Sequence, residues 1–502
     1  MPTFLGIDIG STTVTAVAID TSSNRLLDVV AVANRAEVTS PTDRAKGRSE
    51  WDFSRIARTA FDAVRNLVER PGISSVSSVA SIEGIGVTGQ QQGCQLFDAT
   101  SLESVGPLVS WQDRRTAEPG DSGSIVEQVA ERGAAHLVSS GPRGFAASGC
   151  PIVPGYTSAI LYWLGQHGAL RPGIKASTVP EFFVSTITGT TPVTDATDAA
   201  GWGVFDVVNN RWNADLVRDI GLDYEVLPEV VPSSKVAGKL TAEAALAMGL
   251  QPGIPVSVAS GDHQCAFAGS VTERDRSISI NIGTGGQSTV FMPDPSVLRR
   301  NGDWPDYGSL ELRPYIQGGY LLAGVGVVGG RSFRTVRDFF ARTGSELFDQ
   351  DGDADAIYGG LVELASEAEP GAGGVEFQPF FTGTRVEPGR RGSINGLTPA
   401  NFTPGNVAMA LFAGIARQLH ASYLEAQELG APSRDRLIGS GNGVRRNPVL
   451  RSALSNLFGT SLELTARTDE AAAGAALCSA VATDNFGSIA EASRSFVEYE
   501  SS

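Results

Sequence analysis

The amino-acid sequence predicts an α/β protein made of two related domains. Residues 4–87 have a pattern typical of three strands, a helix and a fourth strand. A strand, a Gly-Ser/Thr turn and a second strand begin at residue 7, and the same series begins again at residue 280. The end of the chain alternates strands with helices, which is typical of α/β domains.

The first domain is predicted to open with a meander of three strands at residues 4–9, 14–19 and 26–32, separated by turns of small and polar residues. An amphipathic helix at 54–69 and a strand at 82–87 follow. The apolar residues of the helix recur at helical spacing: Ile56, Ala60, Val64 and Leu67.

The second copy of the hairpin is expected at residues 277–282 and 288–292. The Gln-Pro-Gly at 251–253 predicts a boundary that divides the chain into domains 1–253 and 254–502. A long helix at 406–429 carries apolar residues at helical spacing. The last predicted elements are a strand at 437–438, a helix at 447–457, a strand at 461–465 and a helix at 469–481.

Composition excludes several classes of protein. The formal net charge is −16, and no cluster of five or more Lys and Arg occurs, so nucleic acid and anionic membranes are not expected partners. No apolar run is long enough to span a bilayer. Four widely spaced cysteines and no signal-peptide pattern predict a cytoplasmic protein. Glycine is abundant, with 59 of 502 residues against roughly 7% in average proteins.

Many glycines lie in three turns that follow strands, near residues 10, 283 and 439. Turns of small residues expose backbone N–H groups that can bind phosphate, although any one of them could be a plain hairpin. Neither a P-loop nor a dinucleotide-binding motif is present. The residues that we expect to contact a nucleotide in the first two turns are Gly10, Thr12, Thr13, Gly283, Thr284 and Gly285.

Two carboxylates are candidates for phosphoryl-transfer chemistry. Asp8 interrupts an apolar strand beside the first turn, where Mg²⁺ bound to phosphates would offset its burial; the alternative is a turn-capping Asp. Asp262 follows the apolar strand at 254–259, where it could orient a hydroxyl and accept its proton; the alternative is a helix N-cap, and both roles can coexist.

Two further segments are typical of sites for polyhydroxylated ligands. Gln90, Gln91 and Gln92 follow the fourth strand and offer several hydrogen-bond donors and acceptors. Trp111 and Asp113 place an aromatic face beside a carboxylate. Each segment on its own is more often an ordinary loop.

Together these motifs resemble the FGGY family of carbohydrate kinases over nearly the whole chain. The resemblance rests on Gly6–Thr12, Gly89–Gly93, Trp111–Arg115, Gly261–Gln264, Gly283–Gly286 and, for the adenosine motif, Gly439–Gly443 with Asp469–Ala476. It implies two ribonuclease-H-like domains of the actin/Hsp70/sugar kinase superfamily around a cleft, with sugar on the N-terminal side and ATP on the C-terminal side. It also implies Asp262 as the catalytic base, Asp8 as a group that positions Mg²⁺, and Gly330, Gly441 and Asn442 beside the nucleotide.

Within the family, residues 198–205 and 211–213 resemble the sedoheptulokinase branch. That likeness implies phosphorylation of a terminal hydroxyl of a ketose, with sedoheptulose as the expected substrate, and it is compatible with a homodimer. Gln91 and Gln92 replace the family's Met-His pair, which leaves the exact sugar open. The alternatives are a kinase for xylulose, ribulose or glycerol, a weakly catalytic sugar sensor, or an actin- or Hsp70-like ATPase.

Overall fold

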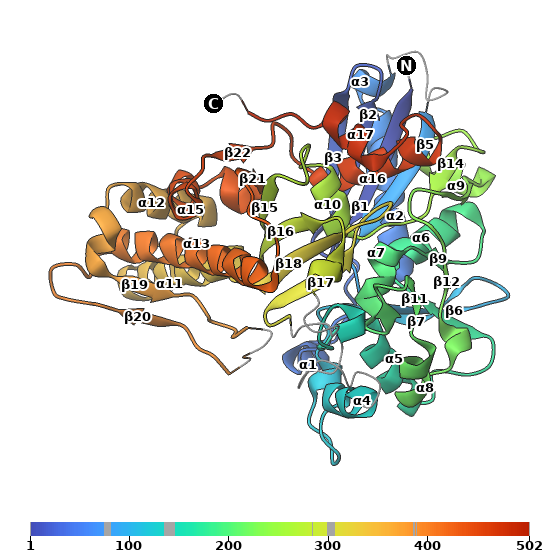
Figure 1. The fold of residues 1–502 in the computed structure, drawn as a ribbon, viewed down its shortest axis with the longest axis horizontal. Helices are drawn as coiled ribbons and strands as arrows, with labels where there is room; N and C mark the ends of the chain where they lie inside the picture. Colours follow the sequence, from blue (N-terminus) through green and yellow to red (C-terminus); the bar gives the residue numbers. More distant parts are fainter. Residues whose placement is uncertain are drawn as a thin grey trace.

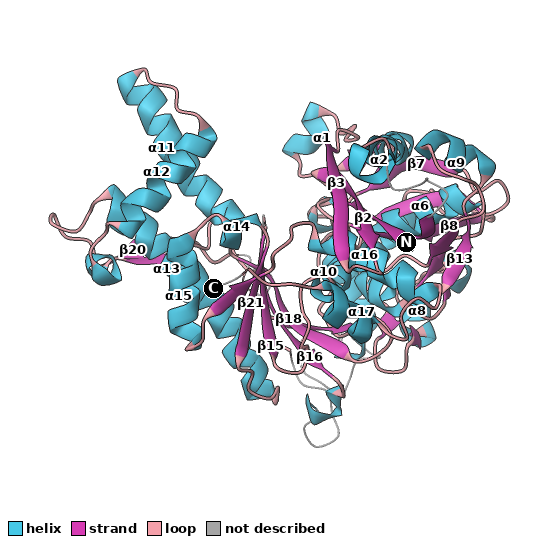
Figure 2. Cartoon of the chain, turned by 90° about the horizontal axis from the view of Figure 1, so that it is seen from above, coloured by secondary structure: helices cyan, strands magenta, loops and turns pink. Residues whose placement is uncertain are grey.

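Two six-stranded mixed sheets form the framework of the protein (Figures 1 and 2). We analysed a computed structural model, which describes residues 2–74, 82–134, 146–283, 285–298, 307–384, 387 and 389–500. Within these residues, no helix combines the length and apolar composition needed to cross a bilayer.

The first sheet has the order β13-β14-β5-β1-β2-β3. β1 pairs antiparallel with β2 and parallel with β5, and β2 pairs antiparallel with β3. This arrangement confirms the predicted meander and fourth strand. The strands are β1 (Thr3–Ile9), β2 (Thr13–Asp20), β3 (Arg25–Ala33), β5 (Ile82–Gly89), β13 (Val236–Lys239) and β14 (Pro255–Ser257).

The second sheet repeats this topology. β15 pairs antiparallel with β16 and parallel with β21, as β1 does with β2 and β5. Five strands of each sheet therefore follow the same order, while β13 and β17 extend opposite edges, which confirms the predicted pair of ribonuclease-H-like units. The strands are β15 (Ser277–Ile282), β16 (Gly286–Met292), β17 (Leu310–Pro314), β18 (Tyr320–Val327), β21 (Arg436–Ser440) and β22 (Leu462–Leu464).

The alternation of side chains along β1 explains how helices cover both faces of the first sheet. Leu5, Ile7 and Ile9 pack in the same core as α2 (Phe53–Val68), whereas Phe4 packs with α16 (Glu470–Ala482). At Gly6 a Cβ would overlap the backbone of α16. Figure 1 shows this helix, from the end of the chain, beside β1 and β5. Part of the glycine excess therefore lets a distant helix lie close to the sheet.

The helix that carries Asp262, α10 (Asp262–Ala268), packs tightly against α16. At Gly474 of α16 a Cβ would overlap the backbone of Cys265 in α10. β14, which follows the expected domain boundary at residue 253, pairs with β5 in the first sheet. The division of the chain at this boundary stays a prediction.

The long helix α13 (Pro404–Leu429) packs on the second sheet, and α11 (Gly330–Phe348) and α12 (Ala354–Ser366) extend away from it (Figure 2). A smaller four-stranded sheet accompanies the first sheet. Its strands are β4 (Glu50–Trp51), β6 (Cys94–Asp98), β7 (Ser104–Val109) and β8 (Ile174–Ser177). The other helices used below are α5 (Thr157–Gln166), α6 (Val179–Thr188), α7 (Ala196–Ala199), α9 (Ala242–Met248), α14 (Asn442–Arg445) and α15 (Pro448–Phe458).

Candidate active site

Asp262 is the first residue of α10, directly after the loop that leaves β14. The N-cap of this helix is Gly261, so the alternative that Asp262 is the N-cap is wrong. Oδ1 of Asp262 instead accepts a hydrogen bond from the backbone N–H of His263 at 2.7 Å within the first turn. Burial raises the pKa of Asp262 to about 6, against the opposing effects of this hydrogen bond and the positive charge of Arg313. A carboxylate with such a pKa can accept a proton near neutral pH.

His263 does not form a dyad with Asp262. Its Nε2 lies 2.9 Å from the hydroxyl of Thr289, and burial, with a smaller effect from Arg313, lowers the pKa of His263 to about 4. The imidazole is therefore neutral at physiological pH and bound to the second sheet.

Asp8 lies near the carboxyl end of β1. Burial, together with the negative charges of Asp262 and Asp469, raises the pKa of Asp8 to about 7. A cation would relieve this repulsion, and oxygen ligands are those that Mg²⁺ prefers. In the described part of the chain, no three His, Cys, Asp or Glu residues are grouped so that they could hold a metal. A Mg²⁺ ion at Asp8 would therefore need water and phosphate oxygens as ligands.

A hydrogen-bond network holds the loop that carries Asp262. The hydroxyl of Thr197 accepts the backbone N–H of Gly261 at 2.8 Å and donates to Oδ1 of Asp195 at 2.6 Å. The other oxygen of Asp195 accepts from the hydroxyl of Ser260 at 2.8 Å. Because these groups are buried and mutually bonded, they fix the start of α10.

Gln91 contacts the same loop. Its Nε2 donates to the carbonyl of Thr197 at 2.8 Å and to Oε1 of Gln264 at 3.3 Å. A Cβ at Gly261 would overlap the amide groups of Gln91 and Gln264, so glycine at this position allows both amides to approach the loop closely. The structure thus brings the loop of Gln90, Gln91 and Gln92, called the Gln-rich loop below, close to Asp262.

Gln90 differs from its neighbour because its amide has no protein partner. The side chain is 4% exposed, and neither Oε1 nor Nε2 has a hydrogen-bond partner among the described residues. The backbone N–H of Gln90 donates to the carbonyl of Ile9 at 3.0 Å, which places the loop beside the end of β1. Buried amides are usually hydrogen-bonded, so this one is available to a ligand.

Trp111 lies next to the Gln-rich loop through Gly93 and Gly155. The N–H of Gly93 donates to the carbonyl of Gly155 at 3.1 Å, and a Cβ at Gly155 would overlap the backbone of Trp111. The side chain of Trp111 is 36% exposed, so part of its ring is accessible. Gln92 has a φ of +66°, which is the left-handed conformation of a tight turn.

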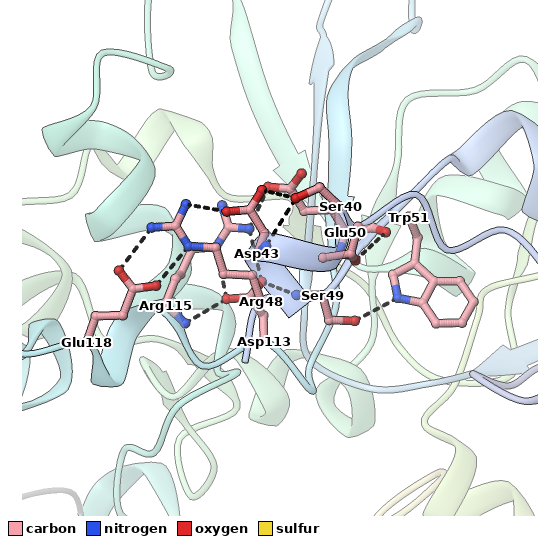
Figure 3. Close-up of polar contacts among 10 residues, drawn as sticks. Ser40, Asp43, Arg48, Ser49, Glu50, Trp51, Asp113, Arg115 and Glu118 are labelled. Carbon is pink, nitrogen blue, oxygen red and sulfur yellow. Dashed lines mark hydrogen bonds and ion pairs between the residues drawn. The ribbon is translucent and has the colours of Figure 1, made fainter. Parts of the chain in front are cut away.

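Asp113, expected beside Trp111, is buried at 1% exposure, and both of its oxygens are bonded to protein groups (Figure 3). One oxygen accepts the N–H of Ser49 at 2.6 Å, and Arg115 donates to both. The carboxylate of Asp113 therefore stabilises the loop that follows Trp111. Because both of its oxygens are bonded to protein groups, the expected contact of Asp113 with sugar stays a prediction.

Three glycine segments meet at the carboxyl end of β15. The N–H of Gly330 donates to the carbonyl of Gly283 at 3.2 Å, and a Cβ at Gly329 would overlap the backbone of Gly285. A Cβ at Gly441 would lie 2.7 Å from the carbonyl oxygen of Ile282. Asn442 is exposed at the start of α14. Thr284 lies outside the described residues.

The corresponding turn of the first sheet carries Gly10 and Thr12 between β1 and β2, and Thr13 is the first residue of β2. Asn34 fixes this turn through two hydrogen bonds. Its side-chain amide donates to the carbonyl of Gly10 at 2.8 Å, and its backbone N–H donates to the carbonyl of Thr12 at 2.9 Å. Both threonine side chains are exposed and can therefore meet a ligand.

Sequence reasoning missed two sets of residues near Asp262. Asp195 and Thr197 lie in a Thr-Asp-x-Thr segment, which is typical of a helix cap and gave no reason to expect contact with a loop 60 residues away. Arg313 and Glu311 lie in β17, where opposite charges two residues apart in an otherwise apolar strand were the available signal.

Comparison with known proteins agrees with this architecture. Residues 3–269 match the N-terminal domain of the FGGY family of carbohydrate kinases, and residues 278–483 match its C-terminal domain. Sedoheptulokinase from Homo sapiens is 27% identical over 504 aligned residues, covering 95% of this chain and 97% of the relative. Glycerol kinase from Leptothrix cholodnii is 28% identical, covering 87% and 83%.

A solved structure with the same fold is xylulose kinase from Rhodospirillum rubrum, with a TM-score of 0.79 and 21% identity. The alignment covers 99% of this chain and 93% of that one. Both family domains are matched in order over most of the sequence. The chain therefore belongs to the FGGY family of carbohydrate kinases and is a phosphotransferase that acts on an alcohol group.

Proposed function

We propose that this protein uses ATP to phosphorylate a terminal hydroxyl of a ketose, and that the ketose is sedoheptulose. The observation that carries the proposal is the position of Asp262 at the start of α10, bound through Thr197 and Gly261 to the loop of Gln91. Sedoheptulose is supported by the sequence likeness to sedoheptulokinase and by the branch-specific segment at 198–205.

In this proposal the sugar binds beside the first sheet. Gln90 supplies a buried amide with both polar atoms available, and Trp111 supplies an apolar surface for the sugar ring or chain. Gln91 and Gln92 shape the loop between them, and Asp113 holds the segment that carries Trp111. A polyol needs several paired donors and acceptors, and this loop provides them.

The nucleotide lies on the second sheet's side. In this proposal the phosphates bind against the glycine backbone at Gly283, Gly285 and Gly330, where no side chain hinders their approach, while Gly441 and Asn442 flank the adenosine. Thr12 and Thr13 reach the phosphates from the first sheet. Mg²⁺ would be held near Asp8, where it neutralises charge on the transferred phosphoryl group.

Asp262 then orients the acceptor hydroxyl and accepts its proton as the oxygen attacks the γ-phosphorus. The bond from that phosphorus to the bridging oxygen breaks, and ADP leaves with the electron pair. The raised pKa of Asp262 matches this role, because the protonated form is stable enough to hold the proton until product leaves.

The test is a profile of phosphate acceptors. Purified protein, ATP and Mg²⁺ are incubated with sedoheptulose, ribulose, xylulose or glycerol, and ADP release and product mass are measured. We expect the largest kcat/KM with sedoheptulose. Phosphorylation of pentoses or glycerol alone would contradict the ketoheptose assignment, and nucleotide binding without any phosphorylated product would indicate a sensor.

A further inference from the structure

A buried guanidinium group, that of Arg313 in β17, lies beside the candidate catalytic carboxylate. The residue is 3% exposed. Its Nε and Nη2 donate to Oε2 of Glu311 at 2.9 and 2.6 Å, and Nη2 also donates to the hydroxyl of Tyr156 at 2.6 Å. Its third nitrogen, Nη1, has no hydrogen-bond acceptor among the described residues.

The bonded partners place Arg313 between two parts of the candidate site. Tyr156 directly follows Gly155, which packs against the backbone of Trp111 and accepts the N–H of Gly93. On the other side, the positive charge of Arg313 acts on Asp262, and Gln264 of α10 donates to the carbonyl of the next residue, Pro314, at 3.1 Å. Arg313 therefore lies between the segment where Gly155 contacts Trp111 and the start of α10.

An unused donor on a buried cation is unfavourable, since the group has lost its hydrogen bonds to water without gaining a partner in the protein. The other two nitrogens of Arg313 are held firmly by Glu311 and Tyr156, so the group cannot turn to find another partner without breaking those bonds. A ligand oxygen at this point would satisfy Nη1.

The surrounding charges indicate what kind of oxygen fits. Glu311 already balances the charge of Arg313, and the carboxylate of Asp262 interacts with Arg313 from α10. Asp262 in turn interacts with the carboxylate of Asp8. A further negative charge would be repelled by them. A hydroxyl or carbonyl oxygen of an uncharged sugar is compatible with the site, whereas an aldonate or a sugar phosphate is not.

We propose that Arg313 is a substrate-binding residue whose Nη1 donates a hydrogen bond to one oxygen of an uncharged sugar, other than the oxygen that is phosphorylated. Tyr156 and Glu311 are positioning residues that hold the guanidinium in place. This inference rests on the proposed kinase function and adds to it a specificity contact from the second sheet.

The test combines variants of the enzyme with variants of the sugar. The kcat/KM is measured for wild type, Arg313→Met and Arg313→Lys with the best ketose and with single-deoxy derivatives that each lack one non-reacting oxygen. Arg313→Lys keeps the positive charge, and it is the variant that tests the contact if Arg313→Met does not fold. Arg276→Met is the control, because Arg276 is 56% exposed and forms only surface ion pairs.

We expect the parent sugar to lose about 10- to 100-fold in kcat/KM with either Arg313 variant, as for a hydrogen bond from a charged donor. One deoxy derivative should be phosphorylated equally by wild type and variants, because the contact is already absent. ADP affinity should not change. The control should behave as wild type with every sugar.

Equal losses with all sugars, or no loss with any, would overturn the role of Arg313 while leaving the proposed function intact. Better use of aldonates than of ketoses by the wild type would overturn the charge argument. A wild-type enzyme that phosphorylates no sugar would contradict the proposed function instead.

Discussion

The two sheets share the order of five strands but present different chemistry at the ends of their central strands. Beside β1, polar side chains are linked to one another, as in the bonds among Gln91, Thr197 and Asp195. Beside β15, the corresponding space contains glycine backbone, with Gly283 bonded to Gly330 and Gly329 packed against Gly285.

This difference indicates how one topology serves two ligands. Side-chain amides and carboxylates distinguish sugars by the number and direction of their hydroxyls. Backbone N–H groups free of side chains bind phosphate, which every nucleoside triphosphate shares. Changes in the polar network beside β1 should therefore alter acceptor kinetics, and changes in the glycine turns beside β15 should alter nucleotide kinetics. The following substitutions test that separation.

The largest effect is expected from Asp262→Asn. The amide oxygen can still accept the N–H of His263, so α10 should begin normally, but the base is lost. Turnover should fall by about 100-fold or more, while ADP affinity measured by calorimetry is retained. Turnover within a few-fold of wild type would show that another group accepts the proton.

Gly283→Ala should act on the nucleotide side. A Cβ at this position meets nothing within 4 Å, so the free energy of unfolding should barely change. If phosphate binds at this turn, the methyl group will hinder it and raise the KM for ATP by about 10-fold, the loss of one charge-assisted hydrogen bond.

The matched control is Gly359→Ala, in the interior of α12, where a Cβ also meets nothing within 4 Å. It should leave both KM values unchanged and stabilise the protein by about 0.5–1 kcal/mol. A Gly283→Ala variant that behaves in the same way would argue against a phosphate site at the β15–β16 turn.

Thr197→Val should have a smaller effect, confined to the acceptor side. The change removes the hydroxyl that links Gly261 to Asp195, so the buried N–H of Gly261 loses its partner while Oδ1 of Asp195 keeps only the N–H of Asp198, at a cost of about 1–3 kcal/mol in stability. Acceptor kcat/KM should fall several-fold at an unchanged KM for ATP. A rise in the KM for ATP alone would contradict the separation of the two sides.

The smallest effect concerns stability. Glu181, in α6, is buried, and this burial raises its pKa to about 7 from an ordinary value of 4.5. Folding therefore favours the protonated form, so the stability that Glu181 contributes is complete below pH 4.5 and is lost as the pH rises through about 7. Thermal denaturation at pH 5 and pH 8 should show a smaller pH-dependent loss in Glu181→Gln than in wild type.

Glu243→Gln, on the exposed surface of α9, is the control and should keep the pH dependence of the wild type. An unchanged pH dependence in Glu181→Gln would mean that other buried acids, such as the neighbouring Asp198, account for the loss.

The sequence was sufficient for the strands that open each domain and for the repeat. Alternating apolar residues and glycine turns are local signals, and they located β1, β2, β15 and β16 to within two residues. The packing of α16 on β1 was not predictable, because Gly6 has no local reason to be glycine and its partner lies more than 460 residues away.

In the candidate site, too, some residues were predicted from the sequence and others were missed. The turns near Gly283 and Gly439 were predicted from the sequence, and Gly330 was expected from the family resemblance. The structure brings Gly283, Gly330 and Gly441 together. Arg313 and Thr197 were missed, because their importance arises from contacts between distant segments. The catalytic and binding roles of all these residues stay predictions.

The most direct test of the division between sugar and nucleotide sides is Gln90→Leu. Leucine has a similar size and removes two buried polar atoms that have no partner among the described residues, so the melting temperature should stay the same or rise. If Gln90 binds the sugar, acceptor kcat/KM should fall by about 10-fold or more with no change in the KM for ATP. Unchanged acceptor kcat/KM, or a selective change in the KM for ATP, would contradict the account.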